Sequence, residues 1–539
     1  MTYLEPTIEK RLQRILPGAM SYVKARGETK LLDLTVGWSA PKTQPSERLL
    51  INLKKIIKDH PLTNSIQPDQ LIDDLTASFH SPVLAANHQG LDTHPEMVQG
   101  LLLFGLPTIL GLRKIPIVIL ATGSAPLNNP TGPGAIMLGR RGCLGQRLMA
   151  RMFSRSRDGL MAAFAPLITK DLVHNRLTRL KDLTEWTNSE KGLIKVFLEK
   201  WLLDPEFLSQ NNFANQSAWL AQAFWARHFG RTSQVEQTDQ YSQSRPSVPP
   251  ICHLELEKLV NAILTQDLVD QSSVAYYAMF DPNARNALLV TLAGQRGTWC
   301  RELAGSCRFE PNQIKSGQFE RCQLYPSRLS HCQINPAQMD TQPAVDLNQS
   351  RGTIFFWGVH EGRRFPLALA FKGSTPILKG THLELPLTPT HILTALAENQ
   401  IYPGLFLDYL VLASHGVLAH GGTLMTDYLP PILAQAGKIL GCSLINEFRP
   451  LPVAGLLPIG ARGSEGFSAA GALELFGADP WGHGLAQKLA NLTINQVWPL
   501  TAREWYQEIT PVGSRVANWR SGLDGAALEL ASSQVAWAA

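Results

Sequence analysis

Two short apolar runs, each ending abruptly at a polar loop, dominate the hydrophobic pattern of residues 82–134. The first run, 83–86, stops at the polar residues 87–95. The second, 115–121, stops at a loop rich in Gly, Pro and Asn, 123–134, and a long apolar segment with helical character separates the two runs. Strand, polar loop, helix, strand and polar loop form the pattern of a parallel βαβ unit. Ligands of open parallel sheets bind beyond the carboxyl ends of the strands, so both loops are candidate binding loops.

Other segments show helical or strand periodicity. Residues 1–80 predict a helical layer, with apolar positions recurring at helical spacing. Amphipathic patterns predict helices over 144–153 and 253–268. Runs rich in β-formers predict a hairpin of strands 353–359 and 365–371, followed by a further strand at 381–385.

The predicted fold class is α/β, a Rossmann-like parallel sheet with extensive helical insertions and an added β-hairpin. A chain of 539 residues allows two to four domains at about 150 residues each. The predicted parts are a helical N-terminal layer (1–80), a Rossmann-like βαβ core with a helical insertion (81–233), a linker or mobile loop (234–250), a second α/β part packing on the core (251–450) and a Gly/Pro-rich and helical C-terminal segment (451–539).

Composition narrows the class of protein. Hydrophobic residues make up 44% and charged residues 17%, an ordinary globular balance. The net charge of +5 is small and its basic residues are scattered, so we expect no nucleic-acid partner. The most apolar segment, 97–112, is shorter than the roughly 20 residues of a membrane-spanning helix. The start shows no apolar signal-peptide core, and the seven cysteines are widely spaced, which favours a cytoplasmic protein with reduced thiols and no membrane partner.

The first loop holds the densest group of titratable side chains in the chain, namely His88, Asp92 and His94. A histidine oriented by a carboxylate can act as general acid or base. The same three side chains are standard ligands for a divalent metal. A structural alternative is that Asn87 and Asp92 cap a helix that starts near His94. We predict His88, Asp92 and His94 as catalytic residues, with metal binding and capping as the alternatives.

The second loop offers hydrogen-bonding groups. Ser124, Asn128 and Asn129 can bond a ligand, and Gly123 permits close approach of the backbone. The same composition is equally typical of a plain turn.

Gly421 and Gly422 precede an apolar helical segment, where free N–H groups can meet an anion, or they merely separate two helices. Asp427 and Tyr428 line the site only if that helix faces the first loop. We take residues 415–428 as the opposite wall. The predicted substrate-binding residues are Asn87, Gln89, Gly90, Thr93, Gly123, Ser124, Asn128, Asn129, Gly421, Gly422, Asp427 and Tyr428.

Two stretches share a pattern with a known family. The loop His-Gln-Gly-Leu-Asp-Thr-His-Pro at 88–95 and the glycine pair followed by Tyr428 resemble features of the bacillithiol synthase-like family of cysteine ligases. The positions in register in the loop are Gly90, Leu91, Thr93 and Pro95. The resemblance implies a Rossmann-like core that handles a small polar, amino-acid-like or nucleotide-like ligand. The chain departs from the family at His88 and His94, which replace non-titratable residues.

These observations predict a small-molecule biosynthetic enzyme. The expected reaction is ligase- or transferase-type bond formation on an amino-acid-like metabolite, with His88 or His94 as acid/base. The alternatives are a metal-dependent hydrolase using His88, Asp92 and His94, and a non-catalytic binding or scaffold protein. The His-x3-Asp spacing is one residue shorter than the His-x4-Asp of glycerolipid acyltransferases, which makes that activity a minor alternative. No phosphate-loop or dinucleotide motif follows a strand, so the cofactor is unknown.

Overall fold

The computed structural model describes most of the chain. The described residues are 6–37, 44–58, 60, 67–85, 87–141, 147–229, 249–299, 352–442, 444, 455–463, 466–477, 482–510 and 528–530.

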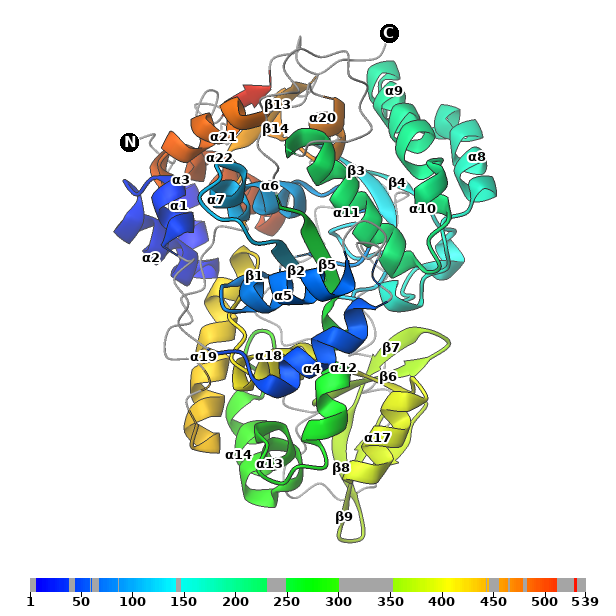
Figure 1. The fold of residues 1–539 in the computed structure, drawn as a ribbon, viewed down its shortest axis with the longest axis vertical. Coiled ribbons are helices and arrows are strands. Elements are labelled where there is room, and N and C mark those ends of the chain that lie inside the picture. The colour runs from blue at the N-terminus through cyan, green and yellow to red at the C-terminus, as the bar shows by residue number, and fades with distance from the viewer. Residues whose placement is uncertain are drawn as a thin grey trace.

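A four-stranded parallel sheet of order β12-β1-β2-β5 lies at the centre (Figure 1). Its strands are β1 (Val83–Leu84), β2 (Ile117–Ala121), β5 (Ile251–Glu255) and β12 (Ala419–His420). Helices α6 (Pro95–Phe104) and α7 (Leu106–Ile109) connect β1 to its parallel neighbour β2. The predicted βαβ unit is therefore confirmed, and the chain is a mixed α/β protein built on a parallel sheet.

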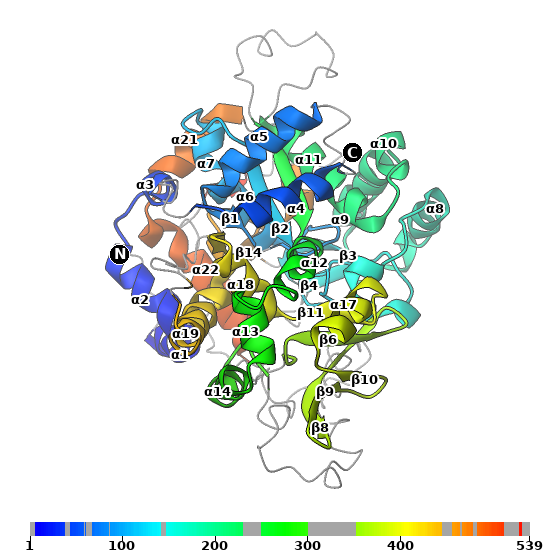
Figure 2. The ribbon, with the colours of Figure 1, turned by 60° about the horizontal axis from the view of Figure 1, so that its bottom comes forward.

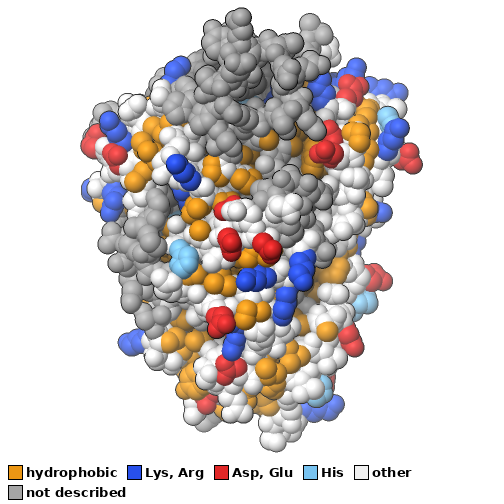
Figure 3. Space-filling model, viewed as in Figure 1, with side chains coloured by type: hydrophobic (Ala, Val, Ile, Leu, Met, Phe, Trp, Pro, Cys, Tyr) orange, Lys and Arg blue, Asp and Glu red, His pale blue; other side chains and the backbone are white. Residues whose placement is uncertain are grey.

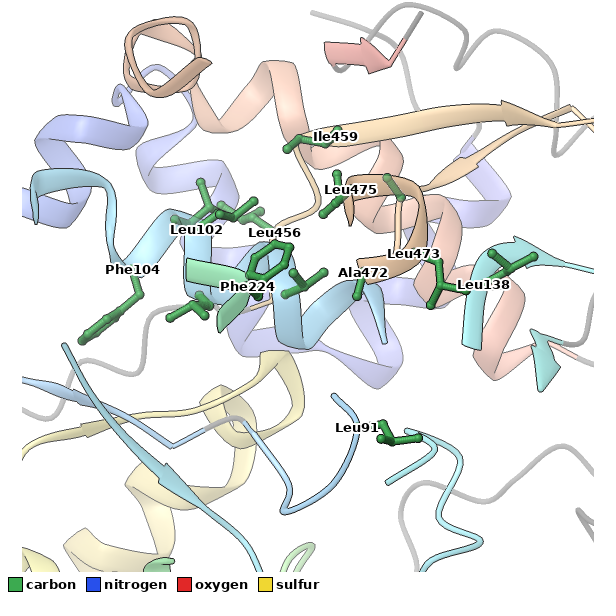
Figure 4. Packing of buried hydrophobic residues seen from close by; sticks show 14 of the residues in the cluster. Leu91, Leu102, Phe104, Leu138, Phe224, Leu456, Ile459, Ala472, Leu473 and Leu475 are labelled. Atoms are coloured by element: carbon green, nitrogen blue, oxygen red, sulfur yellow. The ribbon is translucent and has the colours of Figure 1, made fainter. Parts of the chain in front are cut away.

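The central strands are apolar throughout because both faces of the sheet are covered. In β2, Ile117 and Ile119 enter one hydrophobic core, whereas Val118 and Leu120 enter another. The second core is shared with α4 (Glu47–Ile57), α5 (Pro68–Phe79), α12 (Leu256–Asp267) and α18 (Leu405–Ser414). The first core includes α6 and α11 (Phe213–Phe229), and Figure 4 shows Leu102, Phe224 and Leu456 gathered there.

The described part of residues 1–80, predicted as a helical layer, is built from helices. Besides α4 and α5 it contains α1 (Pro6–Ile15), α2 (Pro17–Arg26) and α3 (Leu31–Val36). These three helices pack beside α21 (Gly482–Asn491) and α22 (Ile494–Ile509), so the two ends of the chain share one core (Figure 1).

The remaining elements surround the two cores. The helices are α8 (Lys170–Thr178), α9 (Asn188–Phe197), α10 (Pro205–Leu208), α13 (Val274–Phe280), α14 (Pro282–Leu292), α17 (Pro389–Ala397), α19 (Thr423–Leu440) and α20 (Ala472–Gly477), with short 3-10 or π turns at Arg155–Arg157, Ala162–Phe164, Leu180–Asp182 and Leu198–Leu202. The strands are β3 (Ala135–Arg141), β4 (Arg147–Arg151), β6 (Phe356–His360), β7 (Arg363–Pro366), β8 (Ala368–Lys372), β9 (Thr375–Lys379), β10 (Glu384–Pro386), β11 (Ile401–Pro403), β13 (Ile459–Gly463), β14 (Gly466–Ala469) and β15 (Leu528–Leu530).

Two predicted helices were wrong in whole or in part. Residues 147–151 form β4, because they pair antiparallel with β3 instead of closing helical turns. The helix predicted over 253–268 begins only at Leu256, because the residues before it form β5 and pair with β2. The sequence of a short apolar run does not distinguish a helix from a strand. Whether a neighbouring strand is available for pairing decides which of the two forms.

The predicted hairpin is confirmed as β6 and β7, which pair antiparallel. The second strand, predicted as 365–371, is shorter than expected. The chain leaves that sheet at Leu367 and continues as β8 in a sheet with β9 and β10. Of the strand predicted at 381–385, only residues 384 and 385 belong to β10. Segments 230–248 and 300–351 lie outside the described residues, so the greater part of the predicted linker is not among them.

The described surface carries charges of both signs. Figure 3 shows acidic and basic side chains interspersed on the face that α4 and α5 occupy. Within the described ranges, no helix has the length and apolar character needed to cross a bilayer.

Candidate functional site

The carboxyl edge of the central sheet brings together segments that are distant in the sequence. The first predicted loop follows β1, the second follows β2, and Gly421 follows β12. The fourth strand, β5, adds its last residue, Glu255, and Glu257 lies just beyond its end; neither residue was among the predicted site residues. In a parallel sheet all four strand ends lie on one edge, so these groups share one site region.

The first two loops are held together by backbone hydrogen bonds. The Thr122 amide donates to the Asn87 carbonyl at 2.9 Å, and the Gln89 amide donates to the Thr122 carbonyl at 3.0 Å. Gly90 has a φ of 156°, and a Cβ there would overlap the Pro133 backbone. Glycine is therefore required at Gly90 by this close approach.

Glu257 anchors the second loop from beneath. Its two carboxylate oxygens accept the backbone N–H groups of Gly123 at 2.7 Å and Ser124 at 2.8 Å. Burial, followed by the neighbouring charge of Glu255, raises the pKa of Glu257 to about 7, against the lowering effect of these hydrogen bonds. The carboxyl group of Glu257 thus titrates near neutral pH.

A small sheet of order β11-β6-β7 lies beside α12 (Figures 1 and 2) and contacts this edge through two side chains. It supplies Tyr402, whose hydroxyl donates to Glu255, and Arg364, which donates to the Ser124 carbonyl at 2.9 Å. The Arg364 guanidinium also lies 4.4 Å from the centre of the Trp357 ring. Burial lowers the pKa of Arg364 to about 10, opposed by the charge of Glu257, so the guanidinium is charged at pH 7.

A cavity of about 220 Å³ lies at this edge. From the first loop it is lined by Gln89, which is 1% exposed and whose side-chain oxygen and nitrogen both have no hydrogen-bond partner among the described residues. A Cβ on Gly123 would lie 3.0 Å from Gln89 Oε1 and 3.1 Å from Glu255 Oε1, so the two oxygens flank the space left by the missing side chain. The lining residues are Ile56, His60, Gln89, Ala163, Ala165, Asn212, Phe213, Ala214, Asn215, His253, Leu254, Glu255 and Lys258.

His88, Asp92 and His94 do not converge on one point. Among the described residues, these three included, no three His, Cys, Asp or Glu side chains are arranged to hold a metal ion. The metal-ligand alternative for this triplet was therefore wrong. His94 is the N-cap of α6 and accepts the Glu96 amide at 3.2 Å, so a helix starts where the capping alternative placed it, but its cap is His94 and not Asn87 or Asp92.

Asp92 turns toward a histidine that the sequence reading missed. Its Oδ2 accepts from the Asn87 side-chain nitrogen Nδ2 at 2.9 Å and lies 3.8 Å from His253 Nε2. His88 lies 3.1 Å from Thr131 Oγ1 through Nδ1, and burial lowers its pKa while the Asp92 charge opposes that change. His253 lines the cavity, whereas His88 and His94 do not.

Four further predicted residues hold the fold together. Thr93 is fully buried and its hydroxyl accepts the Met137 amide of β3 at 2.8 Å. Asn128 accepts the backbone amide of Gly159, 31 positions along the chain, and Asn129 accepts the backbone amide of Thr131, as in an ordinary turn. Ser124 is buried and bonded through its backbone to Glu257 and Arg364. Their placement favours the plain-turn alternative for the second loop.

The segment predicted as the opposite wall faces elsewhere. Gly421 and Gly422 do lie at the end of β12, where Gly422 is the N-cap of α19. Asp427, however, accepts the Gly18 amide of α2 at 2.5 Å, and Tyr428 packs against Gly297. None of the described residues 415–428 lines the cavity, so the opposite wall was assigned wrongly. Residues of β5, α12 and the start of α11 form it instead.

The missed residues had a signal in the sequence. The run Ile-Cys-His-Leu at 251–254, mostly apolar, follows two prolines and ends at the charged residue Glu255, a pattern typical of a short strand. Reading 253–268 as one helix hid it. Neither a scan of protein-family models nor searches of curated proteins and of solved structures finds a match to this chain.

Proposed function

We propose that this protein is a biosynthetic enzyme that forms a bond to a small amino-acid-like metabolite, as ligases and transferases do. The observation that carries the proposal is the Gln89 amide, unpaired among the described residues, in a cavity that also holds a carboxylate, Glu255, and an ammonium, Lys258. Buried amides normally have partners, so an unpaired one that lines a cavity points to a polar ligand. A Rossmann-like core fits the parallel sheet with a ligand at its carboxyl edge.

The charges of the cavity suit a zwitterion. The oxygens of Gln89 and Glu255 flank one space and can accept from an ammonium group. Lys258 lines the same cavity and can pair with a carboxylate. At about 220 Å³ the cavity is smaller than the roughly 300 Å³ at which sites for drug-sized ligands begin, which favours a metabolite of amino-acid size.

We assign the acid–base role to Glu255 in place of His88 and His94, since Glu255 lines the cavity. The bound ammonium passes one proton to the Glu255 carboxylate, and the resulting amine bonds to the carbon of an activated acyl donor. The bond between that carbon and the donor's leaving group breaks, the leaving group departs with the electron pair, and the remaining extra proton on nitrogen is released to solvent. Tyr402 donates a hydrogen bond to that carboxylate and orients it. His88 and Asp92 then shape the loop that carries Gln89.

Binding of amino acids to the purified full-length chain tests the ligand. We expect at least one amino acid to stabilise the protein, by about 2.7 kcal/mol at one hundred times its Kd. Glu255→Gln and Lys258→Met abolish this gain, while Lys54→Met, which removes an exposed lysine of α4, preserves it. If no amino acid stabilises the wild type, or if both cavity variants respond like Lys54→Met, the assignment is wrong.

Turnover separates an enzyme from a binding protein. The stabilising amino acid is incubated with the protein and activated acyl and phosphoryl donors, and products are identified by mass spectrometry. A product formed by the wild type and lost in Glu255→Gln supports bond formation with Glu255 as base. Binding without any product supports the scaffold alternative and overturns the enzymatic proposal.

A further inference from the structure

A second polar array lies away from the cavity, where α4, α12 and α18 meet. Ser46 is the N-cap of α4, Asp267 is the last residue of α12, and His415 follows the end of α18. Ser46 Oγ lies 2.6 Å from His415 Nδ1, and His415 Nε2 lies 3.0 Å from Asp267 Oδ2. None of the three residues lines the cavity, and α4 separates Ser46 from the lining residue Ile56 by about 15 Å at 1.5 Å per residue.

The surrounding hydrogen bonds set the direction of each proton. Ser46 Oγ accepts the Leu49 amide at 3.1 Å, which leaves its own O–H to donate to His415 Nδ1. Since Nδ1 accepts, the ring proton of a neutral His415 lies on Nε2 and is donated to Asp267. Hydroxyl, imidazole and carboxylate are thus connected in the order of a serine hydrolase triad, with the two ring nitrogens exchanged.

Solvent exposure increases from the carboxylate through the imidazole to the hydroxyl, as in a serine hydrolase, where the nucleophile must be reached by the substrate. The Asp267 side chain is 1% exposed, that of His415 10%, and Ser46 is half-buried. Arg48 pairs with both Asp267 and Asp270, and its side chain is 28% exposed. The carboxylate is therefore fixed inside, while the hydroxyl is reached from solvent.

The backbone around the array is held in place. The Ser46 amide donates to the His415 carbonyl at 3.0 Å. Gly416 has a φ of 78°, and a Cβ there would overlap the Gln44 carbonyl, so the two segments approach as closely as glycine permits. The amides of Glu47 and Arg48, in the first turn of α4, have no acceptor within the helix and can stabilise an oxyanion beside Ser46.

We infer that Ser46 is the nucleophile of a second, hydrolytic site that accepts small esters at the surface. The Ser46 Oγ bonds to the acyl carbon as its proton passes to His415 Nδ1. The ester C–O bond breaks, and the imidazolium returns that proton to the leaving alcohol. Water then attacks the acyl-enzyme in the same way, releasing the carboxylic acid and restoring Ser46. Asp267 is a positioning residue that holds the imidazole and stabilises its charge.

The inference is independent of the proposed function and has an internal control. Ser273 is also a half-buried N-capping serine, which accepts the Tyr276 amide at 3.0 Å. Its hydroxyl donates to the Asp267 carbonyl and not to an imidazole. A serine-directed fluorophosphonate probe should therefore modify Ser46 and leave Ser273 unmodified, as read by peptide mass spectrometry of the full-length protein.

Variants test the role of each group. Ser46→Asn retains a capping side chain and should lose both the adduct and the hydrolysis of p-nitrophenyl acetate. His415→Gln should slow labelling by roughly 100-fold or more, the usual contribution of a general base. Asp267→Asn should slow labelling, because a neutral amide of the same size cannot stabilise the positive charge that His415 gains, and Asp267→Glu, which keeps the carboxylate, should restore part of the rate. If the role of Asp267 were merely structural, the folded Asp267→Asn protein would be labelled at the wild-type rate.

Two results would overturn the inference. The first is a wild-type protein in which Ser46 carries no adduct or is labelled no faster than Ser273. The second is a folded His415→Gln protein, judged by its circular dichroism, that is labelled at the wild-type rate. If His415→Gln does not fold, the comparison of Ser46 with Ser273 in the wild type decides.

Discussion

Replacing Glu257 by glutamine should change how the stability of the protein depends on pH. The folded-state pKa of Glu257 is about 7, against an ordinary value of 4.5, because burial disfavours the charged form. A carboxyl whose pKa is raised by folding binds its proton more tightly in the folded state. Its contribution is fully present below pH 4.5 and is lost as the pH rises through 7.

The size of the change follows from the two pKa values. A difference of about 2.5 units at about 1.36 kcal/mol per unit corresponds to about 3 kcal/mol of unfolding free energy lost between pH 4.5 and 7. The Glu257→Gln protein would lack this dependence. At pH 5 the amide nitrogen of its new side chain would face a backbone N–H of Gly123 or Ser124, and leaving that buried donor unpaired costs about 1–3 kcal/mol.

Urea unfolding of wild type and Glu257→Gln at pH 5, 6, 7 and 8, followed by circular dichroism, measures the effect. We expect the variant to be less stable at pH 5 and to equal or exceed the wild type at pH 8. The matched control is Glu199→Gln, since Glu199 is 44% exposed and should keep the wild-type pH dependence. A stability difference between wild type and Glu257→Gln that is the same at every pH would refute the reasoning.

Three further substitutions test contacts that hold the fold together. Gly90→Ala should lower the free energy of unfolding, measured in urea, by about 3 kcal/mol, from backbone strain and overlap with Pro133. Gly422→Ala, which meets open space at an N-cap, should lower it by at most about 1 kcal/mol. Arg364→Met should lose about 2–4 kcal/mol by the same assay, since it removes the bond to the Ser124 carbonyl and the contact with a tryptophan ring; an unchanged urea midpoint would contradict this. Asp427→Ala should speed hydrogen exchange of the first amides of α2, which Asp427 caps through Gly18, and unchanged exchange would show that this bond does not hold the helix.

The parts of the site that could be predicted from the sequence are those that depend only on the few residues around them. The loop at 87–95 was recognisable because an apolar run ends at polar residues, and Gln89 within it does line the cavity. His94 illustrates the limit, because a histidine before Pro95 can be a catalyst or an N-cap, and only the Glu96 amide beside Nδ1 decides. The same limit applies to Asp427, which was placed correctly on a helix but faces α2.

The sequence by itself determined the elements: the βαβ unit around β1 and β2, the helical N-terminal layer, and the polar loop that contributes Gln89. These depend on periodicity, turns and caps, which act over a few residues. Only the tertiary structure decided which strand lies beside β2. The pairing of β5 with β2 brings Glu257 beneath Gly123, 134 positions away in the chain, and places Glu255 opposite Gln89. Such contacts form because both faces of the sheet must be buried at the same time. This requirement involves segments far apart in the chain, so it cannot be read from any short stretch of sequence.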